Sequence, residues 1–89
     1  MHAILRTSQF RRDVKLAQKR GKDTGHIRTV IEALTQGRTL SPKYRDHQLK
    51  GMFKDCRECH IEPDWLLIYR IEGNILQLVR TGTHSDLFR

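Results

Sequence analysis

The sequence predicts one α+β domain in which a two-helix hairpin packs on one face of a small antiparallel sheet, in the order β-α-α-β-β-β. The length of 89 residues suits a single domain covering positions 1–89. The first half carries apolar residues at helical spacing, whereas the second half carries three strand-like segments joined by short turns. Helices followed by hairpins are typical of α+β proteins, and the sheet face without helices is then free to hold a site.

A short strand is expected at residues 2–6. A helix then begins at Thr7 or Ser8, whose hydroxyls can accept a hydrogen bond from a free N–H of the first turn. Gly21 ends this helix, because glycine readily adopts the left-handed conformation that often follows a helix C-terminus. The apolar residues of the helix recur at the spacing of one face, namely Phe10, Val14 and Ala17.

A second helix is expected to begin at Asp23 or Thr24 and to stop at Gly37. The turn between the two helices is only a few residues long, so they should form an antiparallel hairpin. The pattern of residues 38–51 is irregular, and Ser41-Pro42 favours an extended or turn geometry. The apolar face of the second helix comprises Ile27, Val30, Ile31 and Leu34.

Three strands are expected at about residues 56–61, 65–71 and 75–81. Glu-Pro-Asp and Glu-Gly-Asn separate them, and such short connectors make the strands an antiparallel meander. A last helical turn is expected at residues 85–88.

The net charge of +7 is concentrated in the first half of the chain. Residues 1–40 carry nine basic and three acidic side chains, whereas residues 41–89 carry eight and seven. This asymmetry predicts that the first half binds a polyanion through its phosphates; the alternative is a solvated helix face that only keeps the protein in solution. The basic side chains of the first helix are Arg11, Arg12, Lys15, Lys19 and Arg20.

The sequence contains no run near the ~18 apolar residues that a membrane helix needs. The apolar stretch after Met1 is also too short for a secretory signal. We therefore expect a soluble cytoplasmic protein in which the two cysteines stay reduced.

Cys56, Cys59 and His60 match the C-x-x-C-H pattern of c-type haem attachment. That attachment normally occurs outside the cytosol, and no export signal is present. Zinc held by these three residues and His47 is a second possibility. Residues 56 and 59 of a strand point to opposite faces, however, so two ordinary strand cysteines are favoured over both and no metal or cofactor is expected.

The polar residues of the second half fall near strand ends that the meander brings together. His60 leads into the turn containing Asp64, Arg80 lies near the end of the last strand, and His84 follows it. These four side chains can therefore converge at one end of the sheet.

Such a group suits RNA cleavage by the 2′-hydroxyl on the neighbouring phosphate. An imidazole can take and give a proton near neutral pH, and Arg80 can bind a phosphate through two parallel donors. Trp65 and Phe88 offer ring faces on which a base can stack. The plainer interpretation, slightly favoured from composition and order alone, is that Trp65 belongs to the core and Arg80 forms a salt bridge.

Four segments change that balance, because together they resemble the YafQ branch of the RelE/ParE toxin superfamily of bacterial type II toxin–antitoxin systems. H-x-E-P-D-W and R-T-G-T-H-x-x-L-F are the most specific of these motifs. The likeness covers nearly the whole chain in the right order, in residues 14–20, 44–51, 60–69 and 80–88.

The resemblance implies a metal-independent endoribonuclease that cleaves translated mRNA on the ribosome, leaving a 2′,3′-cyclic phosphate and a 5′-hydroxyl. It implies that His84 is the principal acid/base and that Arg80 neutralises the phosphate. His47, His60 and Asp64 would share activation of the 2′-hydroxyl and orientation of the phosphate. The remaining residues that the resemblance places in the active site are Trp65 and Phe88.

The resemblance also implies partners: the 70S ribosome and mRNA, and a dimeric ribbon-helix-helix antitoxin that forms a heterotetramer with the toxin and binds operator DNA. The basic helix would then contact ribosomal RNA. Two other function classes are a gyrase poison with the same fold, against which the histidines argue, and a plain nucleic-acid-binding module. The sequence leaves open the codon preference, the division of roles among the shared residues, the affinity and stoichiometry of the antitoxin, and activity on free RNA.

Overall fold

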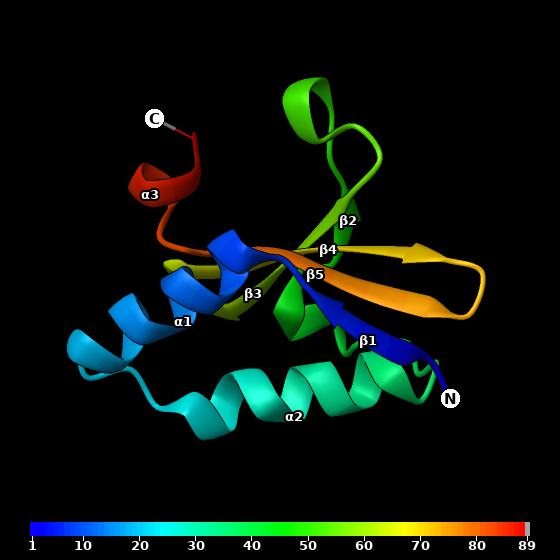
Figure 1. Ribbon diagram of the computed structural model, residues 1–89, viewed down its shortest axis with the longest axis horizontal. Coiled ribbons are helices and arrows are strands. Elements are labelled where there is room, and N and C mark those ends of the chain that lie inside the picture. The colour runs from blue at the N-terminus through cyan, green and yellow to red at the C-terminus, as the bar shows by residue number, and fades with distance from the viewer. Residues whose placement is uncertain (89) are drawn as a thin grey trace.

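Five strands form one sheet in the order β1-β5-β4-β3-β2 in the computed structural model, which describes residues 1–88. The helices α1 (Ser8–Lys19) and α2 (Thr24–Thr35) lie on one side of this sheet, and the short helix α3 (His84–Phe88) lies on the other (Figure 1). The predicted α+β class is confirmed, and the predicted elements occur in the predicted order, with one further strand between the second helix and the meander. The strands are β1 (Ala3–Arg6), β2 (His47–Gln48), β3 (Arg57–Glu62), β4 (Trp65–Glu72) and β5 (Ile75–Gly82).

The sheet is mixed, and in this respect the prediction of a purely antiparallel sheet is wrong. β1 pairs with β5 in parallel, whereas the other neighbours are antiparallel. The whole helical layer separates β1 from the meander in sequence, so no tight turn forces β1 to run against its neighbour. The irregular stretch also contributes more than expected: it forms β2 between two 3₁₀ turns, η1 (Pro42–Tyr44) and η2 (Gly51–Phe53).

Both long helices begin and end where the sequence predicts. The Thr7 hydroxyl accepts a hydrogen bond from Phe10 N–H at the start of α1, and the Asp23 carboxylate accepts one from Gly25 N–H at the start of α2. Gly21 and Gly37 follow the two helices with φ of 80° and 73°, in the region that glycine occupies without strain.

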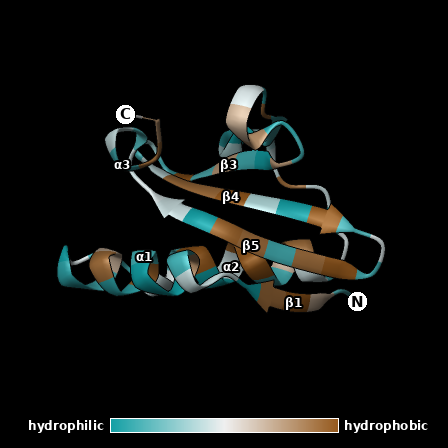
Figure 2. Ribbon diagram, turned by 45° about the horizontal axis from the view of Figure 1, so that its top comes forward, coloured by the Kyte–Doolittle hydropathy of each residue, from teal (hydrophilic) through white to brown (hydrophobic). Residues whose placement is uncertain are grey.

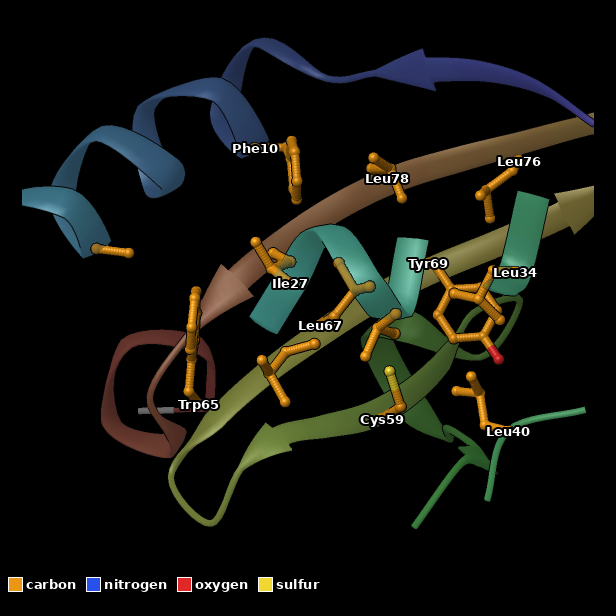
Figure 3. Packing of buried hydrophobic residues seen from close by; sticks show 13 residues of the cluster. Phe10, Ile27, Leu34, Leu40, Cys59, Trp65, Leu67, Tyr69, Leu76 and Leu78 are labelled. Atoms are coloured by element: carbon orange, nitrogen blue, oxygen red, sulfur yellow. The ribbon is translucent and has the colours of Figure 1, made fainter. Parts of the chain in front are cut away.

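The main hydrophobic core lies between the helices and the sheet. Figure 3 shows Phe10 and Ile27 of the helices pointing toward Leu67 and Leu78 of the central strands. Along β4 and β5, hydropathy alternates in part, as Figure 2 shows. On the helix-facing side of β4, Trp65, Leu67 and Tyr69 are buried, and on the opposite side Leu66 and Ile68 are buried where α3 and the segment before β3 cover them.

A smaller apolar cluster lies on that opposite side, which we call the open face. Cys56, Leu66, Ile68 and Leu87 are buried there, and Phe53 packs against them. Leu49 and Val79 also pack against this cluster, which anchors α3 and η2 to the sheet, and polar side chains lie beside it. Within residues 1–88, no helix has the length and apolar character needed to cross a membrane.

Candidate active site

The first turn of α3 presents His84 at the end of β5. Thr83 and Asp86 form a reciprocal cap: Asp86 accepts a hydrogen bond from Thr83 N–H at 2.9 Å, and Thr83 Oγ1 accepts one from Asp86 N–H at 3.1 Å. Arg20, just after α1, reaches the same carboxylate at 2.7 Å and 3.3 Å. These contacts lower the pKa of Asp86 to about 2, the hydrogen bond from Arg20 contributing most. The element that carries His84 is thus tied to the helical layer by an ion pair.

Asp64, in the turn between β3 and β4, orients His84. Its Oδ1 accepts a hydrogen bond from the His84 backbone N–H at 2.9 Å and lies 2.7 Å from Nδ1 of the ring. The backbone bond, followed by the ring bond, lowers the pKa of Asp64. Because an ionised carboxylate only accepts, Nδ1 is the donor in this pair and Nε2 is left for a substrate.

Glu58 lies between the other two histidines of the site. It is 4% exposed, and its Oε1 is 3.6 Å from His47 Nε2 and 3.5 Å from His60 Nε2. The register explains this arrangement: His47 is paired with Glu58 across β2 and β3, and His60 follows two residues later on the same face of β3. A buried carboxylate needs hydrogen-bond donors around it, and the two imidazoles can supply them.

The segment before β2 fixes the His47 ring. His47 Nδ1 donates to the Arg45 carbonyl at 2.7 Å, which leaves Nε2 directed toward Glu58. The neighbouring Asp46 accepts hydrogen bonds from the buried Tyr69 hydroxyl at 2.6 Å and from Arg57 Nε at 3.1 Å. Burial of the phenol, followed by its bond to Asp46, raises the pKa of Tyr69. His47 is therefore held by a backbone acceptor, and the residue beside it by the core.

The histidines of the two parts of the site approach each other directly. The rings of His60 and His84 lie 5.7 Å apart between centroids, with their planes at 63°. One ligand atom from each of Glu58, His60 and His84 lies within 4.8 Å of the others. The arrangement can move protons to and from one substrate, and its spacing would also suit a metal ion with these three ligands.

Arg80 occupies the same sheet row as Glu58 but turns its guanidinium toward α1. Nε and Nη2 of Arg80 bond to the buried Asp13 at 2.8 Å and 3.2 Å, and the same carboxylate accepts the Thr81 N–H at 3.1 Å. The hydrogen bond to Asp13 raises the pKa of Arg80. A salt bridge therefore fixes Arg80, and its remaining N–H groups border a hollow that Ser85 and Asp86 also line. In residues 1–88 no polar contact joins Arg80 to a histidine.

The structure corrects the expected role of Trp65. Its ring is 2% exposed and packs in the main core, as Figure 3 shows, so neither face is open to a base. The first residue of β4 points toward the helices, because the strand alternates from there and Leu66 points to the open face. Phe88, by contrast, is 46% exposed and meets the edge of Phe53 at 6.0 Å, so it is available for stacking.

The basic residues of the first helix differ in their contacts. All five are exposed, but Arg20 is paired with Asp86 and Arg12 donates to Gln9. No ion pair involves the remaining three anywhere in the portion of the chain that the structure describes: Arg11, Lys15 and Lys19.

The two cysteines do not form a joint site. Cys59 lies in the main core and Cys56 in the open-face cluster, as the strand periodicity predicts. Burial raises the pKa of the Cys59 thiol to about 12, so it stays protonated and is a poor metal ligand. The C-x-x-C-H pattern therefore arises from ordinary strand residues.

Sequence reasoning missed Glu58 and Asp13. The sequence does carry a signal for Glu58, because a strand places residues 58 and 60 on one face. Asp13 had no such signal: an acidic residue in a basic helix is usually solvated, and only the fold brings Arg80 to it.

Comparison with known proteins identifies relatives over almost the whole chain. Residues 2–89 match the family described as the bacterial toxin of type II toxin–antitoxin system, YafQ. The mRNA interferase toxin YafQ of Escherichia coli (strain K12) is 43% identical over 83 residues, which cover 92% of this chain and 90% of that protein.

Solved structures give the same result. The crystal structure of the E. coli DinJ–YafQ complex contains a chain that matches with a TM-score of 0.92 and 41% identity, and the match covers 100% of both chains. A toxin from Helicobacter pylori, described as metal-bound, matches with a TM-score of 0.92 and 46% identity over 99% of this chain and 100% of that one.

Proposed function

Because this chain belongs to the YafQ family of bacterial type II toxins, we propose that it is an endoribonuclease that cleaves translated mRNA on the ribosome and so inhibits translation. One observation carries the proposal: the rings of His60 and His84 lie 5.7 Å apart between centroids, and each ring has a carboxylate beside it, Glu58 for His60 and Asp64 for His84. Two positioned imidazoles are what acid/base cleavage of a phosphodiester needs.

The proposed reaction uses the RNA's own 2′-hydroxyl. His60 takes the 2′ proton through the ring nitrogen that does not face Glu58, the 2′ oxygen attacks the phosphorus, and the bond to the 5′ oxygen breaks. His47, whose two nitrogens face the Arg45 carbonyl and Glu58, helps to position these groups. His84 gives a proton to that leaving oxygen, with Asp64 holding the ring through Nδ1. The products are a 2′,3′-cyclic phosphate and a 5′-hydroxyl, and a water-derived nucleophile is not required.

The groups around the histidines supply charge and position. Glu58 holds His47 and His60 on either side of one carboxylate. Arg80 stabilises charge on the phosphate through the N–H groups that Asp13 leaves free. Phe88 provides an exposed ring for a base. We propose that the reaction is metal-independent, since a metal held by Glu58, His60 and His84 would occupy the nitrogens that transfer protons.

The partners follow from charge and from the relatives. We propose that the exposed cations of α1 grip ribosomal RNA, because they are available for phosphates. A relative of this chain is known in complex with DinJ, so a cognate antitoxin is the expected inhibitor of this chain. A ribbon-helix-helix antitoxin that forms a heterotetramer and carries the complex to operator DNA is part of the proposal, as is action in the cytoplasm, where ribosomes are found.

Two other functions are compatible with the fold but less so with the site. A gyrase poison or a plain nucleic-acid-binding module would use the basic helix alone. Neither function accounts for three histidines gathered around Glu58 and Asp64.

Replacement of His84 by alanine tests the proposal. We expect His84→Ala to slow cleavage of ribosome-bound mRNA by roughly 10²–10⁴-fold, because the proton donor to the leaving oxygen is lost. Folding and antitoxin binding should remain, since the ring is about half exposed and the backbone bond to Asp64 is kept. Mapping RNA 5′ ends after brief induction measures cleavage and also gives the codon preference.

His2→Ala is the matched control. It removes an imidazole whose one side-chain hydrogen bond within residues 1–88 is to the Thr35 carbonyl, at the opposite end of the fold, and it should leave cleavage unchanged. Full toxicity of His84→Ala would reject the nuclease proposal.

A further inference from the structure

A pocket of about 480 Å³ lies beside the histidine cluster, between the first turns of α2, the η1 turn and the end of β3. β2 covers β3 only at residues 57 and 58, so the last part of β3 is left open on this edge. The volume is within the range of small-ligand sites and is sufficient for one nucleotide. The residues that give the pocket its chemistry are Lys43, Tyr44, Arg45, His60, Ile61 and Glu62.

The pocket carries free positive charge. Lys43 and Arg45 are exposed, and neither forms an ion pair with any residue between positions 1 and 88, in contrast to Arg20, Arg57 and Arg80. Glu62 is the one carboxylate of the lining, and both its oxygens are engaged, by Lys22 at 3.5 Å and by His26 at 3.0 Å. An anion entering the pocket would therefore meet two uncompensated cations.

The pocket also has an apolar wall. Tyr44 is half-buried, with Lys43 Nζ 5.1 Å from its ring centroid, and the buried Ile61 continues the wall along β3. Cations beside an aromatic and an aliphatic surface suit a phosphate together with a stacked base.

Two residues link the pocket, which lies at the β3 edge toward α2, with the proposed active site on the open face. His60 lines it and also faces His84, and the backbone of Arg45 holds the His47 ring through its carbonyl. The η1 segment thus carries the pocket's cations and orients one of the histidines.

We propose that this pocket binds the nucleotide on the 5′ side of the cleaved bond. The inference rests on the proposed function, in which the 2′-hydroxyl loses its proton on the His60 side and the leaving 5′ oxygen lies at His84. The ribose that carries the attacking hydroxyl belongs to the 5′ nucleotide, so its base and its own 5′ phosphate extend away from His84, toward Lys43 and Arg45. The nucleotide on the 3′ side lies instead toward α3 and Phe88.

The backbone of Arg45 allows a clean test. Its φ is 51°, a left-handed conformation that costs most residues about 1 kcal/mol and glycine almost nothing. Arg45→Gly therefore removes the guanidinium while keeping the carbonyl that holds His47. The test variant is Lys43→Ala with Arg45→Gly, and the matched control is Arg28→Ala with Arg38→Ala, which removes the same charge from exposed positions outside the pocket.

Two measurements are compared. In the first, amide chemical shifts of the free protein are followed while a ribotrinucleotide with one 2′-deoxy residue, which cannot be cut at that residue, is added. In the second, the cleavage rate is measured on programmed ribosomes. We expect shifts centred on residues 43–45 and 60–62, and binding at least tenfold weaker in the test variant. Cleavage at limiting protein should fall by a similar factor, and the control should resemble the wild type.

The outcomes separate the two proposals. If the wild type cuts mRNA but the test variant binds and cuts as the control does, the pocket assignment is wrong and the nuclease stands. If the trinucleotide moves the pocket amides and the wild type cuts no RNA, the nuclease assignment is wrong and the pocket remains an RNA site. Shifts confined to other surfaces overturn the pocket assignment.

Discussion

The two faces of the sheet are built differently. On the helix side, β3, β4 and β5 contribute to one continuous core with α1 and α2, and even the indole of Trp65 is enclosed in it. On the open face, the buried apolar cluster within residues 1–88 has four members, one of which is Leu87 of α3 itself, and a buried carboxylate and three histidines lie beside it. The first face stabilises the fold, and the second leaves room for chemistry.

This difference determines how His84, the proposed proton donor, is held. The five residues of α3 contribute one buried side chain, Leu87, to the open-face cluster. Apart from the contact between Phe88 and Phe53, the other contacts that hold α3 are polar: Asp86 with Arg20, Asp86 with Thr83, and His84 with Asp64. His84 therefore belongs to a short helix that is held mainly by an ion pair and by capping hydrogen bonds. The stability of this helix depends on these local contacts more than on the main core.

The same substitution on the two faces should have different effects. Leu67→Ala opens a cavity in the main core and should lower the free energy of unfolding by about 2–5 kcal/mol. Leu87→Ala should lower it by only about 1–2 kcal/mol, because α3 can detach while the rest stays folded. Cleavage should show the reverse order: folded Leu67→Ala protein keeps its rate, whereas Leu87→Ala loses most of it. Urea unfolding and ribosome-programmed cleavage at 25 °C measure the two quantities. Equal losses of activity per unit of stability would contradict the separation of the faces.

Sequence reasoning predicted the elements that repeat a pattern within themselves. The helical faces of α1 and α2, their capping residues and the three meander strands all follow from periodicity and turn composition. The direction of β1 and the existence of β2 do not, because each depends on a partner far along the chain. Two residues such as His47 and Gln48 carry no periodic signal of their own.

The candidate site was likewise predictable only in part. The antiparallel meander brings His60, Asp64 and His84 together, as the order of the strands predicts. The sequence does not reveal which way an aromatic side chain at the start of a strand points. It therefore predicts Trp65 in the site, although Trp65 belongs to the core. Nor does the sequence reveal that Arg80 forms a salt bridge with the first helix, because Asp13 meets Arg80 only when α1 packs beside β5.

Trp65→Phe sharpens the comparison at a residue that sequence and structure assign to different faces. The indole Nε1 has no hydrogen-bond partner within residues 1–88, so the substitution removes packing and no bond. We expect a loss of about 1–2 kcal/mol in stability and a cleavage rate within about twofold of the wild type. His60→Gln is the contrasting variant on the open face, where cleavage should fall while stability changes little. A large loss of cleavage in stably folded Trp65→Phe would show that the indole takes part in the site.

Asp86→Asn should show that the attachment of α3 through Asp86 depends on pH. The pKa of Asp86 is lowered to about 2 from the ordinary 3.8 by Arg20 and Thr83, so the folded state favours the ionised form. A carboxyl with a depressed pKa adds stability that is present above about pH 4 and is lost as the pH falls from about 4 to 2. Because Arg20 is partly exposed, solvent reduces the contribution to about 1 kcal/mol. The free energy of unfolding of the wild type should therefore exceed that of Asp86→Asn at pH 6, and the two should converge near pH 2.

Asp55→Asn, at an exposed residue outside every ion pair described for residues 1–88, should follow the wild type throughout. A gap between the wild type and Asp86→Asn that stays constant from pH 6 to 2 would show that α3 is held by packing, as the helix side is.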